Sequence, residues 1–114
     1  MFEIELPYPP SVNHVYLRSA NKRMYKDAKA TRYQDDVRLL LLQAKAPLLK
    51  GKLAVMIEVY PPDLRKRDLD NIFKISLDSL ARGGLMSDDS QICWIGAQRM
   101  ETLDGKLIVR VKEI

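Results

Sequence analysis

The sequence is poor in the residues that bind zinc or form disulfides, with one cysteine and one histidine in 114 residues. A single cysteine cannot form an internal disulfide, and the chain offers no histidine–cysteine cluster for zinc. Cys93 stands in the apolar stretch Ile-Cys-Trp-Ile. Since a free cysteine usually behaves as a small hydrophobic residue, we expect Cys93 and its neighbour Trp94 to lie in the core.

Long hydrophobic runs are also absent. Runs such as Leu39–Leu42 are far shorter than the roughly 20 residues that a membrane-spanning helix needs. The first residues lack the basic start and apolar stretch of a signal peptide, so we expect a cytoplasmic protein without a membrane partner. The phosphate-binding pattern G-x-x-x-x-G-K-[ST] does not occur, and we expect no small-molecule cofactor.

What the chain does contain is typical of one folded domain over residues 1–114, with 46% hydrophobic and 30% charged residues. The net charge of +4 suggests a polyanionic partner. Basic residues gather in two runs, and tyrosines lie between the basic residues of the first run. These tyrosines would either stack on DNA bases or pack against a helix. The basic residues that we consider candidate DNA contacts are Arg18, Lys22, Arg23, Lys26, Arg65, Lys66 and Arg67.

The first half of the chain predicts two strands and a helix. Apolar and acidic residues alternate over residues 2–6, as in a half-buried strand, and prolines end it before a loop over residues 11–26. A helix follows and ends before Pro47; it begins either with Asp27 as cap or with a capping box of Thr31 and Gln34. The apolar stretch 53–60 reads as a central strand covered on both faces.

The second half predicts a helix and two strands. The helix starts near Asp70 or Asn71 and ends at Gly83-Gly84. Strands over about 92–100 and 107–111 flank Asp104-Gly105, a strong hairpin signal. The fold class is therefore α/β, a single compact domain with element order β-α-β-α-β-β and a mixed sheet.

Four aspartates lie close to the predicted second helix. Asp68 and Asp70 are two residues apart, so on an extended segment they point the same way. Asp88 and Asp89 follow the glycine turn, and Lys74 comes one helical turn after Asp70. Crowded carboxylates repel one another and a hard divalent cation relieves the repulsion, so this pattern in a basic chain suggests metal-dependent phosphodiester hydrolysis.

Simpler readings of each residue stay open at this point. Asp68 or Asp70 would serve as a helix N-cap, and Asp70 with Lys74 would form a surface ion pair of small energy. Asp88 and Asp89 would be turn residues. A D-x-D pattern alone is common by chance, so spacing leaves a metal site and these structural roles about equally supported.

The stretch from Arg65 to Ile92, which begins R-K-R-D-L-D-N-I-F-K, resembles the signature of the RusA family of Holliday junction resolvases. The segment Pro9-Pro10-Ser11-Val12-Asn13, with Tyr16 nearby, is similar to that family's N-terminal motif and adds Asn13 to the candidate DNA contacts. The resemblance covers nearly the whole chain. It implies a RusA-like fold and a homodimer, often encoded by prophages, that cuts four-way DNA junctions with Mg²⁺, or Mn²⁺, in recombination and repair.

The resemblance also implies roles for particular residues. Asp68, Asp70 and Asp89 match the essential aspartates and would bind one or two metal ions against the scissile phosphate, with Asp88 as a secondary ligand. Lys74 matches the essential lysine and would contact the phosphate or orient the attacking water. Three other functions remain: a general structure-selective nuclease, a non-catalytic nucleic-acid-binding domain, and a small interaction protein with a solvated basic loop.

Overall fold

The structure is a computed structural model that describes residues 1–10, 16–18, 24–26 and 28–114, with side chains omitted for 16–18 and 24–26. Its elements in chain order are β1 (Phe2–Pro7), β2 (Tyr16–Arg18), β3 (Met24–Lys26), α1 (Ala28–Gln43), β4 (Leu53–Tyr60), α2 (Asp70–Arg82), the 3-10 turn η2 (Asp89–Gln91), β5 (Ile92–Arg99) and β6 (Lys106–Glu113). Among the described residues, no helix is long and apolar enough to cross a membrane.

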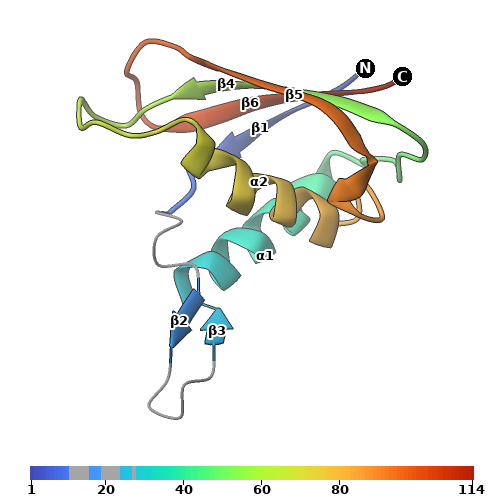
Figure 1. Ribbon diagram of the computed structural model, residues 1–114, viewed down its shortest axis with the longest axis horizontal. Helices are drawn as coiled ribbons and strands as arrows, with labels where there is room; N and C mark the ends of the chain where they lie inside the picture. The colour runs from blue at the N-terminus through green and yellow to red at the C-terminus, as the bar shows by residue number, and fades with distance from the viewer. Residues whose placement is uncertain (11–15, 19–23, 27) are drawn as a thin grey trace.

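Four strands form one mixed sheet in the order β1-β6-β4-β5. The pairs β1–β6 and β6–β4 are antiparallel, whereas β4 and β5 are parallel. Helix α2 connects the two parallel strands, and both helices lie on the same face of the sheet (Figure 1). The predicted α/β domain with a mixed sheet is confirmed.

The core lies between the sheet and the two helices. In β4, Leu53, Val55, Ile57 and Val59 face the helices and are buried, whereas Met56 on the other face is 36% exposed. The prediction that this strand is covered on both faces is therefore wrong, because neither α1 nor α2, the two described helices, packs on the second face. That face instead carries ion pairs between strands, such as those that join Arg110 of β6 to glutamates of β1 and β4.

Two loop predictions are also wrong. Residues 11–26 contain a small antiparallel sheet of β2 and β3, which projects away from the main sheet beyond α1 (Figure 1). Gly105 does adopt the turn conformation expected of Asp104-Gly105, with φ of 85°. The flanking strands β5 and β6 do not pair, however, because β4 lies between them in the sheet. The Asp-Gly pair determines only the conformation of the turn itself, whereas the pairing of strands depends on residues far apart in the sequence.

The strand β5 lies at an edge of the sheet and is more exposed than its composition predicts. Cys93 is exposed and Trp94 is 50% exposed, so the expectation that both lie in the core is wrong. The Trp94 indole lies across Gly96, where an added Cβ would come within 2.6 Å of the ring. Strand β5 pairs with β4 on one side, and none of the described strands pairs with its outer edge.

Helix ends agree with the predictions more closely for α2 than for α1. Helix α2 begins at Asp70 and ends at Gly83, and Gly84 has φ of 95°, as a helix-terminating glycine should. Helix α1 begins at Ala28, so Thr31 lies inside it and the predicted capping box at Thr31 is wrong. The alternative cap, Asp27, lies outside the described residues.

Two contacts fix how the helices sit on the sheet. A Cβ on Gly83 would lie 2.5 Å from the Leu41 side chain, so the absence of a side chain lets α1 and α2 approach closely. Tyr33 of α1 donates a hydrogen bond of 2.8 Å to the carbonyl oxygen of Pro7 at the end of β1. Burial raises the pKa of Tyr33, so its hydroxyl stays protonated and keeps this bond. Both contacts hold the elements that carry the candidate site.

Candidate active site

Asp68 and Asp70, the first acidic pair, stand where the chain enters α2. The N-cap position belongs to Leu69, which makes no side-chain capping bond, so neither aspartate is the cap. Both residues are exposed. Within the described residues, neither carboxylate takes part in a hydrogen bond or ion pair. Their oxygen atoms are therefore available to a hard cation.

Lys74 follows Asp70 by one turn along α2 and is exposed. Asp78 follows Lys74 by a further turn, so residues 70, 74 and 78 form a row along one side of the helix. The sequence reasoning missed Asp78. The four-residue spacing D-x-x-x-K-x-x-x-D was the signal that would have found it.

Asp88 and Asp89, the second acidic pair, flank the start of η2, and they differ in their surroundings. Asp88 forms a capping box with Gln91, and a hydrogen bond from Ser90 lowers the pKa of its carboxyl. The Gln91 amide also donates to the carbonyl oxygens of Leu49 and Gly51 at 3.2 and 3.0 Å. Asp88 therefore has the turn-stabilising role that was the simpler reading of this residue.

Asp89 is exposed and has acidic neighbours. Slight desolvation raises the pKa of its carboxyl, and the nearby carboxylates of Asp88 and Asp78 raise it further. Crowded carboxylates of this kind repel one another when ionised, and a bound divalent cation would remove that repulsion. The two aspartates thus differ: the pKa of Asp89 is raised, whereas that of Asp88 is lowered and its side chain closes the capping box.

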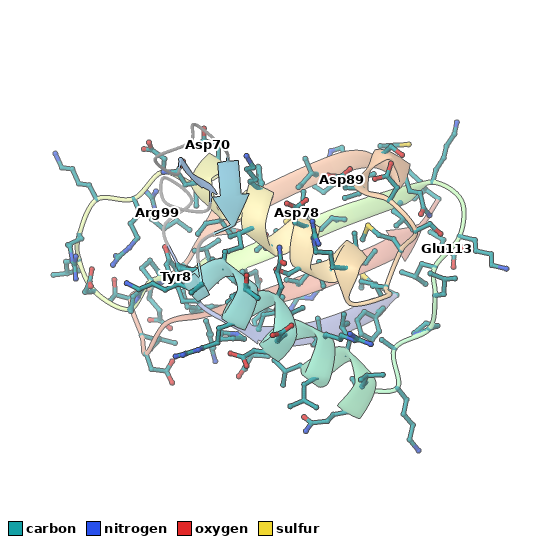
Figure 2. The ribbon with its side chains drawn as sticks, turned by 90° about the horizontal axis from the view of Figure 1, so that it is seen from below. Tyr8, Asp70, Asp78, Asp89, Arg99 and Glu113 are labelled. Atoms are coloured by element: carbon teal, nitrogen blue, oxygen red, sulfur yellow. The ribbon has the colours of Figure 1, made fainter. Side chains whose placement is uncertain are left out.

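Asp70 lies at the start of α2, whereas Asp89 lies beside the later half of the helix, near Asp78 (Figure 2). At 1.5 Å per residue, Asp78, the helix residue near Asp89, is about 12 Å along the axis from Asp70. One metal ion, with metal–oxygen bonds of about 2 Å, does not span such a separation along the helix. Across the described ranges of the chain, no three acidic, histidine or cysteine residues are grouped to hold a metal. Leu69, between Asp68 and Asp70, is helical with φ of −63° and ψ of −35°, so the prediction that both aspartates point the same way from an extended segment is wrong. Within the described residues the structure also does not gather the two acidic pairs into one group.

The basic run before α2 is partly ordered by an aspartate that sequence reasoning missed. Arg67 donates two hydrogen bonds to Asp63, at 2.6 and 3.0 Å, and its guanidinium lies 5.4 Å from the centre of the Tyr8 ring. The hydrogen bond from Arg67 holds the pKa of the Asp63 carboxyl far below its usual range. Arg65 and Lys66 extend into solvent beside the first acidic pair.

The other predicted DNA contacts lie outside this region or outside the described side chains. Arg18 is in β2 and Lys26 is in β3, and only their backbone is described. Asn13, Lys22 and Arg23 lie outside the described residues. Arg99, which sequence reasoning also missed, donates a hydrogen bond to the carbonyl oxygen of Arg67, and so links the end of β5 to the basic run.

Known proteins similar to this chain point to one enzyme family. A family model described as Endodeoxyribonuclease RusA matches residues 7–112. The crossover junction endodeoxyribonuclease rusA of Enterobacteria phage HK97 is 36% identical over 115 residues, which cover 99% of this chain and 95% of that protein. The crossover junction endodeoxyribonucleases of Escherichia coli K12 and of Enterobacteria phage 82 are each 33% identical over the same shares.

Proposed function

Because the chain belongs to the RusA family of endodeoxyribonucleases, which hydrolyse phosphodiester bonds in DNA, we propose that it resolves four-way DNA junctions with Mg²⁺. Mn²⁺ would substitute. Paired cuts in opposed strands would serve recombination and repair of phage or host DNA. The observation that carries the proposal is the exposed first acidic pair beside a basic run, since DNA phosphates need cations and their hydrolysis needs a metal site.

Each residue has a role in this reaction. Asp68, Asp70 and Asp89 would hold the divalent cation, which when bound supplies an activated water and neutralises charge on the phosphate. Lys74, one turn after Asp70, would hold a phosphate oxygen or orient the attacking water. Arg65 and Lys66, with the basic residues of β2 and β3, would bind the DNA backbone on either side.

The distance between the acidic pairs supports a site shared between two subunits. One chain carries both pairs, but Asp70 lies at the start of α2 and Asp89 lies beside its later half. A two-fold homodimer with the two α2 helices antiparallel would place Asp68 and Asp70 of one subunit beside Asp89 of the partner subunit, and would do so twice. Two such sites match the two cuts that a four-way junction requires.

The edge strand β5 is the surface best suited to this dimer. The opposite edge, β1, carries Glu3, Glu5 and Pro7, residues that discourage further strand pairing. Strand β5 has no charged residue or proline from Ile92 to Gln98. Natural sheets rarely leave such an edge open in solution, so we infer that a second β5 pairs with it.

Apolar side chains beside β5 support the same surface. Ile95 and Ala97 point to the helix side of the sheet, yet they are only half-buried, as are Phe73 and Leu77 of α2. The corresponding residues at the β1 edge are buried under α1. A second subunit would extend the core over this strip and remove its apolar surface from water.

An antiparallel pair of β5 strands would also bring the split site together. Asp89 lies just before the amino end of β5, and Arg99 at its carboxyl end contacts the segment that leads to Asp68. In an antiparallel pair, the amino end of one strand meets the carboxyl end of the other. The acidic end of one subunit would then face the basic run of its partner, so the charges are complementary.

The test is cleavage of a synthetic four-way junction, a flap and a linear duplex of shared sequence, each with and without Mg²⁺ or Mn²⁺. We expect paired, metal-dependent nicks in the junction, lost in Asp70→Asn while binding persists. The matched control is Asp104→Asn, which changes an exposed aspartate of the turn before β6 and should cut as the wild type does. Equal cutting of flaps would indicate a general structure-selective nuclease, and binding without cutting would leave a DNA-binding domain.

A further inference from the structure

A hollow of about 220 Å³ lies beyond the carboxyl ends of β4 and β5, next to Asp68. It is formed by the end of β4, the segment that leads to α2, and the segment after β5, with Tyr8 on one side. In open α/β sheets, ligands commonly bind beyond the carboxyl ends of parallel strands. We call this hollow the carboxyl-end pocket.

The pocket combines an apolar interior with a polar rim. Val59 and Ile72 form part of its wall and belong to the buried core, and Leu69 and Met100 continue the apolar surface. Charged and hydroxyl groups of Tyr8, Asp63, Arg67, Arg99 and Asp68 surround this surface. A nucleobase has the matching chemistry, because its faces are apolar and its edges carry hydrogen-bonding groups.

The rim carries Arg65, Lys66, Arg67 and Arg99 against Asp63 and Asp68, so it is basic overall, but part of its positive charge is already engaged. Asp63 accepts two hydrogen bonds from Arg67 and pairs with Arg65 at 3.4 Å, and Arg67 stacks on the Tyr8 ring. Arg99 is tied to the Arg67 carbonyl oxygen. A phosphate would also meet the Asp63 and Asp68 carboxylates. Burial raises the pKa of Tyr8, so at neutral pH its phenol remains a hydrogen-bond donor to a base edge.

We propose that the carboxyl-end pocket takes one unpaired base of the nucleotide that adjoins the cut phosphate, and that this contact sets the sequence preference of cleavage. The proposal rests on the proposed junction-cutting function, since it assumes that the phosphate lies at Asp68 and Asp70. A branch point is the place in DNA where one base leaves its stack at least cost. Tyr8, Arg67 and Met100 would then determine specificity without touching the reacting atoms.

The experiment removes the base from the DNA and fills the pocket in the protein. Junctions carry a single abasic nucleotide at each position flanking the cut, and binding is measured without divalent metal so that no strand is cleaved. Contact with one base is worth about 1–3 kcal/mol, so one abasic position should weaken wild-type binding by about tenfold. Met100→Trp, which would fill the pocket, should bind the intact and abasic junctions equally.

Leu103→Trp is the matched control, because Leu103 is an exposed residue of the same segment that does not line the pocket. It should keep the wild-type response, and thermal unfolding checks that both variants are folded. Tyr8→Phe, which removes only the hydroxyl, is a milder second variant that should reduce the abasic effect. With metal present, Met100→Trp should cut junctions of different sequence at similar rates.

The outcomes separate this inference from the function on which it rests. If every variant and the wild type respond equally to each abasic position, the pocket holds no base and the inference fails, whether or not the junction is cut. If the wild type cuts no junction under any metal, the proposed function fails, and base capture is still decided by the binding data. Loss of the abasic effect in Met100→Trp, with Leu103→Trp responding as the wild type does, supports the pocket.

Discussion

Mixing two inactive variants should restore cutting if each active site is shared between subunits. Asp70→Asn removes a ligand of the first acidic pair, and Asp89→Asn removes a ligand of the second. In a homodimer of either variant, both shared sites therefore lack one ligand. In a mixed dimer, both substitutions fall in one site, and the other site keeps Asp70 from one chain and Asp89 from its partner. Activity should therefore return on mixing, although neither variant is active alone.

The size of the recovery follows from the two-fold arrangement. With equal amounts and free exchange, about half of the dimers are mixed, and each has one intact site of two, so about a quarter of all sites should cut. No mixed dimer has two intact sites. The recovered activity should therefore nick one strand and rarely complete the paired cut.

A supercoiled plasmid with an extruded cruciform distinguishes these results. Paired cuts across the junction convert it to a linear molecule, whereas a single cut yields a nicked circle. We expect linear product from the wild type, little product from either variant, and nicked circles from the mixture. Subunits are exchanged before assay, and mass spectrometry of the intact dimers verifies the exchange. If verified mixed dimers remain inactive, each site lies within one chain and the shared-site reasoning is wrong.

Three further predictions test the interface, the fold and the ion pair. Ile95→Glu should convert a dimer into a folded monomer in sedimentation, whereas Leu39→Glu, on an exposed position of α1, should not. Tyr33→Phe should lower the free energy of unfolding by about 1–2 kcal/mol in urea titrations, because the Pro7 carbonyl oxygen loses its partner; an unchanged midpoint would contradict this. The lowered pKa of Asp63 means that its bond to Arg67 stabilises the fold above the ordinary aspartate pKa of about 4 and is lost as the pH falls below it. Unfolding curves of Asp63→Asn and the wild type should therefore differ at neutral pH and converge in acid.

Local patterns in the sequence predicted local structure well. The alternation in β1 and the glycines after α2 correspond to a half-buried strand and a helix end at the expected residues. Pairing between strands was predicted less well. Asp104-Gly105 makes a turn, but β4 separates the strands on either side, and only the buried side chains of β4 determine that order.

In the candidate site, too, the sequence predicted local structure better than contacts between residues far apart in the chain. The sequence placed Asp68 and Asp70 at the start of α2, as the structure does, but Leu69 between them is helical, unlike the extended segment on which both were expected to point the same way. Spacing along the chain gave no sign that α2 would hold Asp89 away from them, because that depends on the direction in which the helix crosses the sheet. Likewise, Arg99 joins the basic run through a contact that only the fold creates, whereas Asp63 lies four residues before Arg67 and its pairing was within reach of the sequence.

The length of α2 has a consequence for how the enzyme would be controlled. A helix is stiff, so on the proposed shared site a lone subunit would not bring its two acidic pairs to one metal ion. An isolated chain would therefore be harmless to DNA, and cutting would begin only when two copies meet. At concentrations below the dimer dissociation constant, activity would rise with the square of the protein concentration. A nuclease with such a shared site would be inactive at low protein concentration and would need no separate inhibitor.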